Sequence, residues 1–198
     1  MLACYPAASF TIESDRDNFD YVYLAEHLIS LSGRKLHSKK NHLNAFHKAN
    51  PQAQYLPITA DIIPACRMEL ESWYALRIQD EPDDPFIGWE RKAIMEIFDD
   101  YSYFGLQGGA ILLDGRIIAF TFGEQLNENT AVVHVEKADP NIRGAYPAIN
   151  QAYVSSCWQD MMYINREEDM GHDGLRKAKE SYKPEKLIEK FNAQLIES

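Results

Sequence analysis

The sequence predicts an α+β domain built on a mixed, mainly antiparallel sheet flanked by helices. Two apolar runs, Gly108–Leu113 and Arg116–Gln125, flank an Asp-Gly pair, which is the strongest short-range signal for a β-hairpin. A third alternating run at Thr130–Lys137 extends the hairpin into a three-stranded meander. A helix, a strand and a further helix follow in that order. Because a strand, a crossover helix and a strand give a parallel pair, the sheet should contain one such pair.

The amino-terminal half reads as mostly helical. The periodicity predicts weak strands at 9–13 and 20–23, helices at 24–31 and 35–48, a linker between Pro51 and Pro57, and helices at about 62–77 and 86–101. Between the last two helices, Gln79–Pro85 is acidic and proline-rich, and we expect a solvated connector or lid there.

After the meander, Gly144-Ala-Tyr-Pro147 begins a helix that should run to about Cys157. The next predicted strand is Met161–Asn165, and Leu175–Tyr182 is the next helix. For Leu187–Leu195, strand and helix both remain open.

The composition is that of an ordinary globular protein, with 45% hydrophobic and 25% charged residues in 198. No apolar run approaches the roughly 20 residues of a membrane helix, and no secretory signal begins the chain. The three widely spaced cysteines favour reduced thiols. We therefore expect a soluble, cytoplasmic protein, and we cannot infer its oligomeric state.

The net charge of −10 argues against a protein that coats nucleic acid or an anionic membrane with its whole surface. The charge is uneven, because Gly33–Lys48 carries +5 and Asp80–Asp100 carries −6. Local basic sites on an acidic body therefore remain possible. His37, His42 and His47 recur every five residues, so they fan around their helix and predict no metal site.

The segment Tyr163–Tyr182 carries the densest group of polar residues after a core strand. It joins an apolar strand, a glycine-punctuated turn and a basic helix, which is how many ligand sites are built. The alternative is a turn that is tied together by local hydrogen bonds and ion pairs. Its position beside the predicted parallel strand Thr130–Lys137 favours the site.

Four separated segments resemble one known family in order and spacing. They are Gly33–Phe46, Val135-Glu-Lys-Ala138, Arg143-Gly-Ala-Tyr146 and Tyr163–Tyr182. The family is that of the carboxyl-terminal domain of bacterial phosphatidylglycerol lysyltransferases (DUF2156-like), within the acetyltransferase-like (GNAT) superfamily. The resemblance runs from roughly Asp17 to Phe191.

This resemblance implies two tandem acetyltransferase-like halves, of which the second carries the site. Residues 1–57 are then expected to be a helical remnant, which is the tail of a truncated first half and includes a basic helix. Residues 58–198 are expected to form the acetyltransferase-like domain. Either an amino-terminal portion is missing or the chain is a shortened relative. The expected activity is transfer of an acyl group from a thioester or an aminoacyl-tRNA to an amine or hydroxyl. The expected donors are acyl-CoA or aminoacyl-tRNA, with no tightly bound cofactor and no metal.

In that fold, donor phosphates meet the turn before the crossover helix, which here predicts Arg143, Gly144, Ala145 and Tyr146 as donor-binding residues. Gly144 permits close backbone approach, and Arg143 can pair with phosphate bidentately. An ordinary helix cap is the alternative. On the preceding strand, Glu136 is the expected base, and Lys137 is expected to bind a donor phosphate or an acceptor carboxylate, unless the two belong to structural ion pairs.

Roles for the segment Tyr163–Tyr182 follow from side-chain chemistry. Glu167 and Asp169 are candidates for acceptor recognition or proton transfer. The Tyr182 hydroxyl is a candidate for the acid that protonates the leaving group. The candidates for positioning the substrate or an anionic ligand are Asn165, Arg166, Arg176, Lys177 and Lys179. Because residues two apart on a helix diverge, only one of Lys177 and Lys179 should face the cleft with Arg176.

The basic helix near the amino terminus predicts a nucleic-acid contact. Its candidates for holding a tRNA acceptor stem are Arg34, Lys35, Lys39 and Lys40. A solvated helix face is the alternative. For the whole chain, the leading hypothesis is an acyl- or aminoacyl-transferase, and the alternative is a catalytically silent ligand-binding or regulatory module with the same fold.

Overall fold

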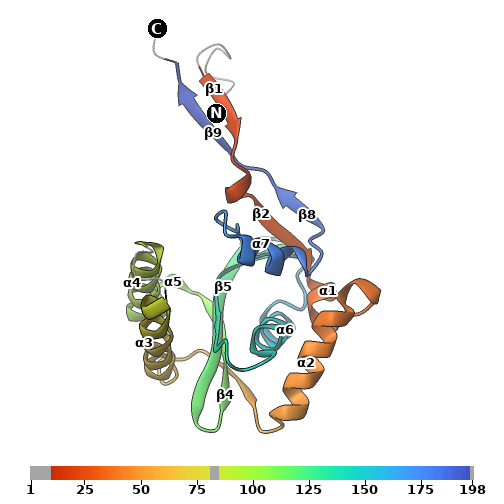
Figure 1. Ribbon diagram of the computed structural model, residues 1–198, viewed down its shortest axis with the longest axis vertical. Coiled ribbons are helices and arrows are strands. Elements are labelled where there is room, and N and C mark those ends of the chain that lie inside the picture. The colour runs from red at the N-terminus through yellow and green to blue at the C-terminus, as the bar shows by residue number, and fades with distance from the viewer. Residues whose placement is uncertain (1–9, 81–84, 197–198) are drawn as a thin grey trace.

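The computed structural model describes residues 10–80 and 85–196. Its main feature is a seven-stranded sheet in the order β3-β4-β5-β6-β7-β2-β8 (Figure 1). The strands are β2 (Asp20–Leu24), β3 (Gln54–Pro57), β4 (Gln107–Leu113), β5 (Arg116–Asn127), β6 (Thr130–Ala138), β7 (Tyr163–Asn165) and β8 (Lys186–Ile188). All neighbours in the sheet are antiparallel except β6 and β7, which confirms the predicted α+β class with one parallel pair.

The meander forms where the turn chemistry predicts it. Asp114 and Gly115 both have positive φ, at 51° and 80°, as a two-residue type I′ hairpin turn requires. Leu113 pairs with Arg116 directly across this turn. The predicted hairpin is therefore confirmed.

Helices cover both faces of the sheet (Figure 1). They are α1 (Ala25–Ser30), α2 (His37–Ala49), α3 (Ile63–Asp80), α4 (Pro85–Asp99), α5 (Tyr101–Phe104), α6 (Ala145–Cys157) and α7 (Asp173–Glu180). α3 and α4 pack on one face around a core of Leu70, Ile94 and Phe120. α6, flanked by α1 and α2, packs on the other face around Leu28, Phe46 and Tyr153.

One sequence expectation fails in the amino-terminal half, and another is not shown by the structure. The expected linker between Pro51 and Pro57 contains β3, which pairs with β4 at the sheet edge, where a terminal proline costs no ladder hydrogen bond. The structure also shows no separate helical remnant in the described part of residues 1–57, because β2 lies between β7 and β8 within the same sheet. The division at residue 57 stays a prediction.

The acidic connector is shorter than expected. α3 continues to Asp80 and α4 begins at Pro85, and the intervening residues 81–84 lie outside the described part of the chain.

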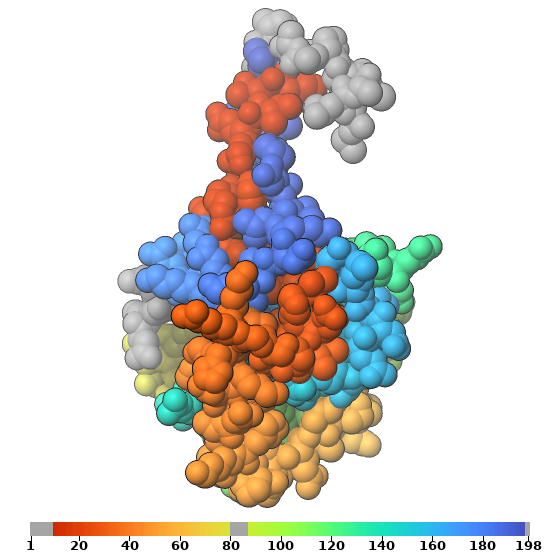
Figure 2. Space-filling view, turned by 90° about the vertical axis from the view of Figure 1, so that its right-hand side faces the viewer, coloured from red at the N-terminus to blue at the C-terminus, as the bar shows by residue number. Residues whose placement is uncertain are grey.

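The segment that was left open, Leu187–Leu195, forms strands. β8 joins the large sheet, and β9 (Phe191–Leu195) pairs with β1 (Phe10–Ser14) in a separate two-stranded sheet. We call this β1–β9 pair the ribbon. Figure 2 shows it standing out from the body of the molecule.

Candidate functional site

The parallel strands β6 and β7 pair over only three residues and then part. Val132 faces Asn165 at the last paired position. Beyond it, β6 continues to Ala138 alongside β5, whereas the chain after β7 joins β2, where the Arg166 N–H donates to the Tyr21 carbonyl at 2.9 Å. A bulge in β6 at His134 accompanies the separation, since Gly123 faces Val133 and Phe122 faces Val135. Side chains of both diverging segments fill the opening.

On the α6 side, the opening contains a buried ion pair. Arg166 Nη2 donates to Glu136 Oε1 at 2.8 Å, and the side chains are 12% and 10% exposed. The other carboxylate oxygen of Glu136 accepts from Asn150 Nδ2, also at 2.8 Å. Burying two charges costs several kcal/mol per ion, so such a pair needs close geometry and further hydrogen bonds.

Two polar atoms in this group are buried and unsatisfied. Among residues 10–80 and 85–196, no atom completes a hydrogen bond to Nη1 of Arg166 or to Oδ1 of Asn150. Asn150 is 1% exposed. Buried donors and acceptors are nearly always paired, so this donor and this acceptor are available to an ordered water or to a bound group that carries the complementary atoms.

Two lysines complete a cationic cluster, which we define as Lys39, Arg166 and Lys179. Lys39 Nζ lies 4.3 Å from the ring centroid of Tyr182, and Arg166 lies 4.8 Å from the same centroid. Lys179 Nζ donates to the backbone carbonyls of Arg166 and Glu167. The pKa of Lys179 is lowered to about 8 by burial and by the neighbouring Arg166. Burial, followed by the same guanidinium, also lowers the pKa of Lys39.

On the α4 side, the opening adjoins a cavity of about 440 Å³. We call it the acidic pocket, because its polar lining is Glu90, Glu124, His134 and Glu167. Its apolar lining is Ala93, Ile94, Ile97, Phe104, Leu106 and Val135. His134 bridges two carboxylates, with Nδ1 at 2.8 Å from Glu167 and Nε2 at 3.1 Å from Glu124. The hydrogen bond with Glu167 raises the pKa of His134 against the effect of burial.

Lys137 points to the α4 side, opposite to Glu136, as strand alternation predicts. Its ammonium lies 2.6 Å from Glu90, whose other oxygen accepts from Tyr74. Burial lowers the pKa of Lys137, and Glu90 opposes that shift. The structure therefore contains the ion pair that was the alternative to a ligand contact.

Asp169 lies in a closed network. Its oxygens accept from Arg176 Nε and Nη2, both at 2.8 Å, from the Tyr21 hydroxyl, and from the Gly171 N–H at 2.9 Å. Burial alone would raise the pKa of Asp169, but the hydrogen bonds from Arg176 and Tyr21 hold it well below its usual range. Fully buried and fixed in the charged form, Asp169 fits an anchor for α7 better than a proton carrier.

Other candidates in the segment Tyr163–Tyr182 divide between site and scaffold. Asn165 ties the turn, since its side chain donates to Asp20 and accepts from the Glu167 N–H. Lys177 is exposed, whereas Lys179 turns inward, so one of the two faces the cleft as helix geometry predicts. Tyr182 is buried, and burial raises the pKa of its hydroxyl, which therefore keeps its proton.

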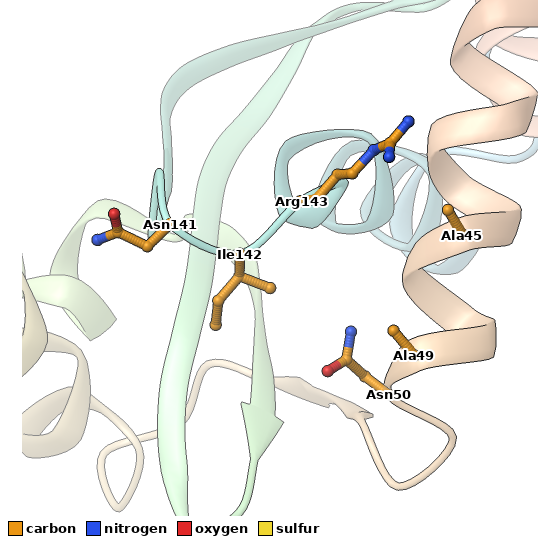
Figure 3. A pocket seen from close by; sticks show the side chains of 6 residues that line it. All are labelled: Ala45, Ala49, Asn50, Asn141, Ile142 and Arg143. Carbon is orange, nitrogen blue, oxygen red and sulfur yellow. The ribbon is translucent and has the colours of Figure 1, made fainter.

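The four predicted donor-binding residues in the turn before α6, Arg143 to Tyr146, do not line one common site. Gly144 has φ of 86°, and a Cβ there would lie 2.5 Å from the His42 carbonyl oxygen, so glycine is needed to pack α6 on α2. Ala145 is in the core, and Tyr146 is 44% exposed. Arg143 instead lines a cavity of about 410 Å³ between this turn and α2 (Figure 3), together with Ala45, Ala49, Asn50, Asn141 and Ile142.

The predicted basic helix contributes one residue to the opening. Lys39 belongs to the cationic cluster, while Lys40 donates to the Ser30 carbonyl at 3.2 Å. Arg34 and Lys35 are exposed at the start of the helical segment. Sequence reasoning missed Asn150 and Glu90, and the signal for Asn150 was an amide side chain at helical spacing from Tyr153 and Val154, on the apolar face of its helix.

The parted parallel pair, the meander before it and the charged opening between its strands define an α+β domain of acetyltransferase-like topology. Residues 3–194 match the family model described as "Phosphatidylglycerol lysyltransferase, C-terminal". The chain belongs to this family.

Solved structures agree on the fold. A conserved protein of unknown function from Bacteroides thetaiotaomicron is 40% identical with a TM-score of 0.90, covering 98% of this chain and 65% of that chain. L-PGS from Bacillus licheniformis is 13% identical with a TM-score of 0.65, covering 97% of this chain and 63% of that one.

An uncharacterised protein of Mycoplasmoides gallisepticum is 27% identical over 180 residues, which are 89% of this chain and 56% of that protein. This chain thus spans less than two thirds of the length of these relatives. Among the residues that the structure describes, no helix is both long and apolar enough to cross a membrane.

Proposed function

We propose that this chain is an aminoacyl- or acyl-transferase domain whose donor carbonyl is bound where β6 and β7 part. The observation that carries the proposal is the buried Glu136–Arg166 pair with an unsatisfied nitrogen on Arg166. A donor N–H held in a site of low water content is what a developing oxyanion requires. Membership in a lysyltransferase family supports a transferase.

The two sides of the opening favour an aminoacyl donor over a plain acyl thioester. The acidic pocket combines carboxylates with an apolar wall, which suits an amine on an aliphatic stem. The cationic cluster on the other side suits the phosphates of a donor such as aminoacyl-tRNA. A donor that spans the opening therefore meets complementary charge at each end.

In the proposed reaction, an amine or hydroxyl of the acceptor attacks the donor carbonyl carbon. Arg166 Nη1 donates to the resulting oxyanion, and Glu136 positions the guanidinium. The proton of the nucleophile passes to Glu167 or its partner His134, because both oxygens of Glu136 already accept hydrogen bonds. Collapse breaks the ester or thioester bond, and the leaving group takes a proton, for which Tyr182 remains the candidate.

Binding and transfer test this proposal separately. Filter binding with charged tRNA and calorimetric titration with coenzyme A thioesters should show that charged tRNA binds. Glu167→Gln should then lower the transfer rate about 100-fold or more, in the range typical of a lost acid–base group. Glu168→Gln is the matched control, because Glu168 pairs with Lys190 outside the opening. The proposal fails if neither donor class binds or if both variants transfer at the same rate.

A second candidate is a catalytically silent ligand-binding module. One observation favours it: Glu136, Lys137 and Asp169 are all engaged in ion pairs. Donor binding without transfer to any amine or hydroxyl acceptor would support this candidate over the transferase.

A further inference from the structure

The opening between β6 and β7 offers bases for the nucleophile but, in Tyr182, a poor acid for the leaving group. When the donor ester breaks, negative charge develops on the leaving oxygen, and a group that protonates this oxygen lowers the barrier. Burial raises the pKa of the Tyr182 hydroxyl well above its ordinary value of 10.0, which makes this hydroxyl a weak acid. The reaction therefore calls for another proton donor in the opening.

The leaving group of the proposed donor lies on the α6 side of the opening. In the proposed function, the donor carbonyl is placed at Arg166, and the phosphates of a charged tRNA, which follow the leaving oxygen, are placed at the cationic cluster. The candidate bases Glu167 and His134 line the acidic pocket on the α4 side. An acid on the side opposite to these bases must belong to the cationic cluster.

Within the cationic cluster, Lys39 is the member best placed to give a proton to a ligand. Arg166 keeps its charge, because a guanidinium does not lose a proton in proteins. Lys179 is 8% exposed, and its ammonium already donates to the backbone carbonyls of Arg166 and Glu167. The Lys39 ammonium lies over the Tyr182 ring, 4.3 Å from its centroid, and in the described part of the chain no oxygen accepts a hydrogen bond from it.

The surroundings of Lys39 favour loss of its proton. Lys39 is half-buried on α2, and Arg166 lies over the same tyrosine ring at 4.8 Å. Burial, followed by the Arg166 guanidinium, lowers the pKa of Lys39, whereas Glu136 opposes this shift. A lysine of lowered pKa is a stronger acid than a lysine in water. Because the side chain is only half-buried, water can return the proton after each turnover.

We propose that Lys39 is the general acid that protonates the leaving oxygen, an assignment that rests on the proposed function. As the tetrahedral intermediate collapses, the C–O bond of the donor ester breaks and its electron pair goes to the leaving oxygen. Lys39 Nζ gives one proton to that oxygen and becomes a neutral amine. The proton of the nucleophile, held by Glu167 or His134, passes to water, and water returns one proton to Lys39.

Lys39→Arg separates proton donation from positive charge, because arginine keeps the charge but not the exchangeable proton. Transfer to ethanolamine is measured from tRNA charged with lysine and from a lysine thioester of coenzyme A. Lysine supplies the amine on an aliphatic stem that suits the acidic pocket. A ribose hydroxyl needs an acid to leave, whereas a thiol, with a pKa of about 8.5, leaves without one. Lys39→Arg should lower transfer from charged tRNA about 100-fold or more and transfer from the thioester less than about 3-fold.

Lys48→Arg is the matched control, because Lys48 is exposed on the opposite face of the same helix. It should transfer from both donors like the wild type, and filter binding should show that both arginine variants still bind charged tRNA. Thioester transfer by Lys39→Arg shows that this variant is folded.

The remaining outcomes separate this assignment from the proposed function. Wild-type rates of Lys39→Arg with both donors would overturn the assignment and leave Lys39 as a charge that holds phosphate. Equal loss with both donors would overturn it as well, because the leaving thiol needs no acid. A wild-type chain that transfers from neither donor contradicts the proposed function itself.

Discussion

Removing the charge of Glu136 should destabilise the fold more than removing the whole ion pair. Glu136→Gln leaves Arg166 buried without a counter-charge and next to Lys39 and Lys179. Breaking one partner of a buried pair typically costs 3–5 kcal/mol, and because glutamine keeps one acceptor for the guanidinium, we expect a loss of about 3 kcal/mol. With a urea slope of roughly 2 kcal/mol/M, the unfolding midpoint should fall by about 1.5 M.

The double variant Glu136→Gln/Arg166→Met supplies the decisive comparison. It removes both charges, so its free energy of unfolding should return to within about 1 kcal/mol of the wild type, as replacement of a buried pair by apolar groups often does. The coupling energy from the double-mutant cycle should then be about 2 kcal/mol or more. If the losses of unfolding free energy in the two single variants add up to the loss in the double variant within about 0.5 kcal/mol, the ion pair is screened by water. The argument for an oxyanion site of low water content would then fail.

Three further predictions concern residues around the opening. The pKa of Lys179 is lowered to about 8 from 10.5, so between these values the unfolded chain holds a proton that the folded chain has lost. Stability of the wild type relative to Lys179→Met should therefore rise with pH across that window, by up to about 3 kcal/mol in urea titrations. The pKa of His134 is raised in the folded state, so the wild type should be more stable to unfolding than His134→Gln at low pH. This extra stability should be fully present below about pH 6.5 and should disappear as the pH rises through the pKa of His134 in the folded protein. Gly144→Ala should lower the melting temperature by roughly 5 °C or more, because the new Cβ meets the His42 carbonyl in a left-handed backbone.

Each of these has an internal control. Gly174→Ala, in α7 with open space around the new Cβ, should be neutral or slightly stabilising, so equal destabilisation by both alanines would contradict the packing argument for Gly144. A pH-independent difference between the wild type and Lys179→Met would show that this ammonium is solvated. For His134, an NMR titration that gives the imidazole a pKa below 6.5 would contradict its hydrogen bonds with the carboxylates of Glu124 and Glu167.

Local patterns predict the meander, the parallel pair and the crossover helix, because short-range turn chemistry and periodicity determine them. Helix faces were harder: in α3, the large apolar side chains of Met68 and Leu76 are 62% and 52% exposed, while Cys66 and Tyr74 are buried. The apolar periodicity of this helix is weak, so single-residue assignments depended on contacts that the sequence does not contain.

For the candidate site, the sequence identified the charged residues but not their connections. Glu136, Arg166 and Lys179 were predicted as functional, and the structure brings them together. Their partner Asn150 comes from a helix, and only the packing of α6 on the sheet places it beside Glu136. The predicted donor turn at Gly144 had a competing explanation, close helix packing, that becomes visible only when α2 is in place.

The position of β2 has a consequence for synthesis of the chain. Residues 20–24 leave the ribosome well before their strand partners, because Val22 pairs with Asn165 and Tyr21 pairs with Leu187. The helices that follow β2 must likewise wait for α6 before their apolar faces are covered. Such long-range pairing delays completion of the sheet until β7 and β8 have been made, and until then the unpaired strand edges of the nascent chain are exposed to aggregation.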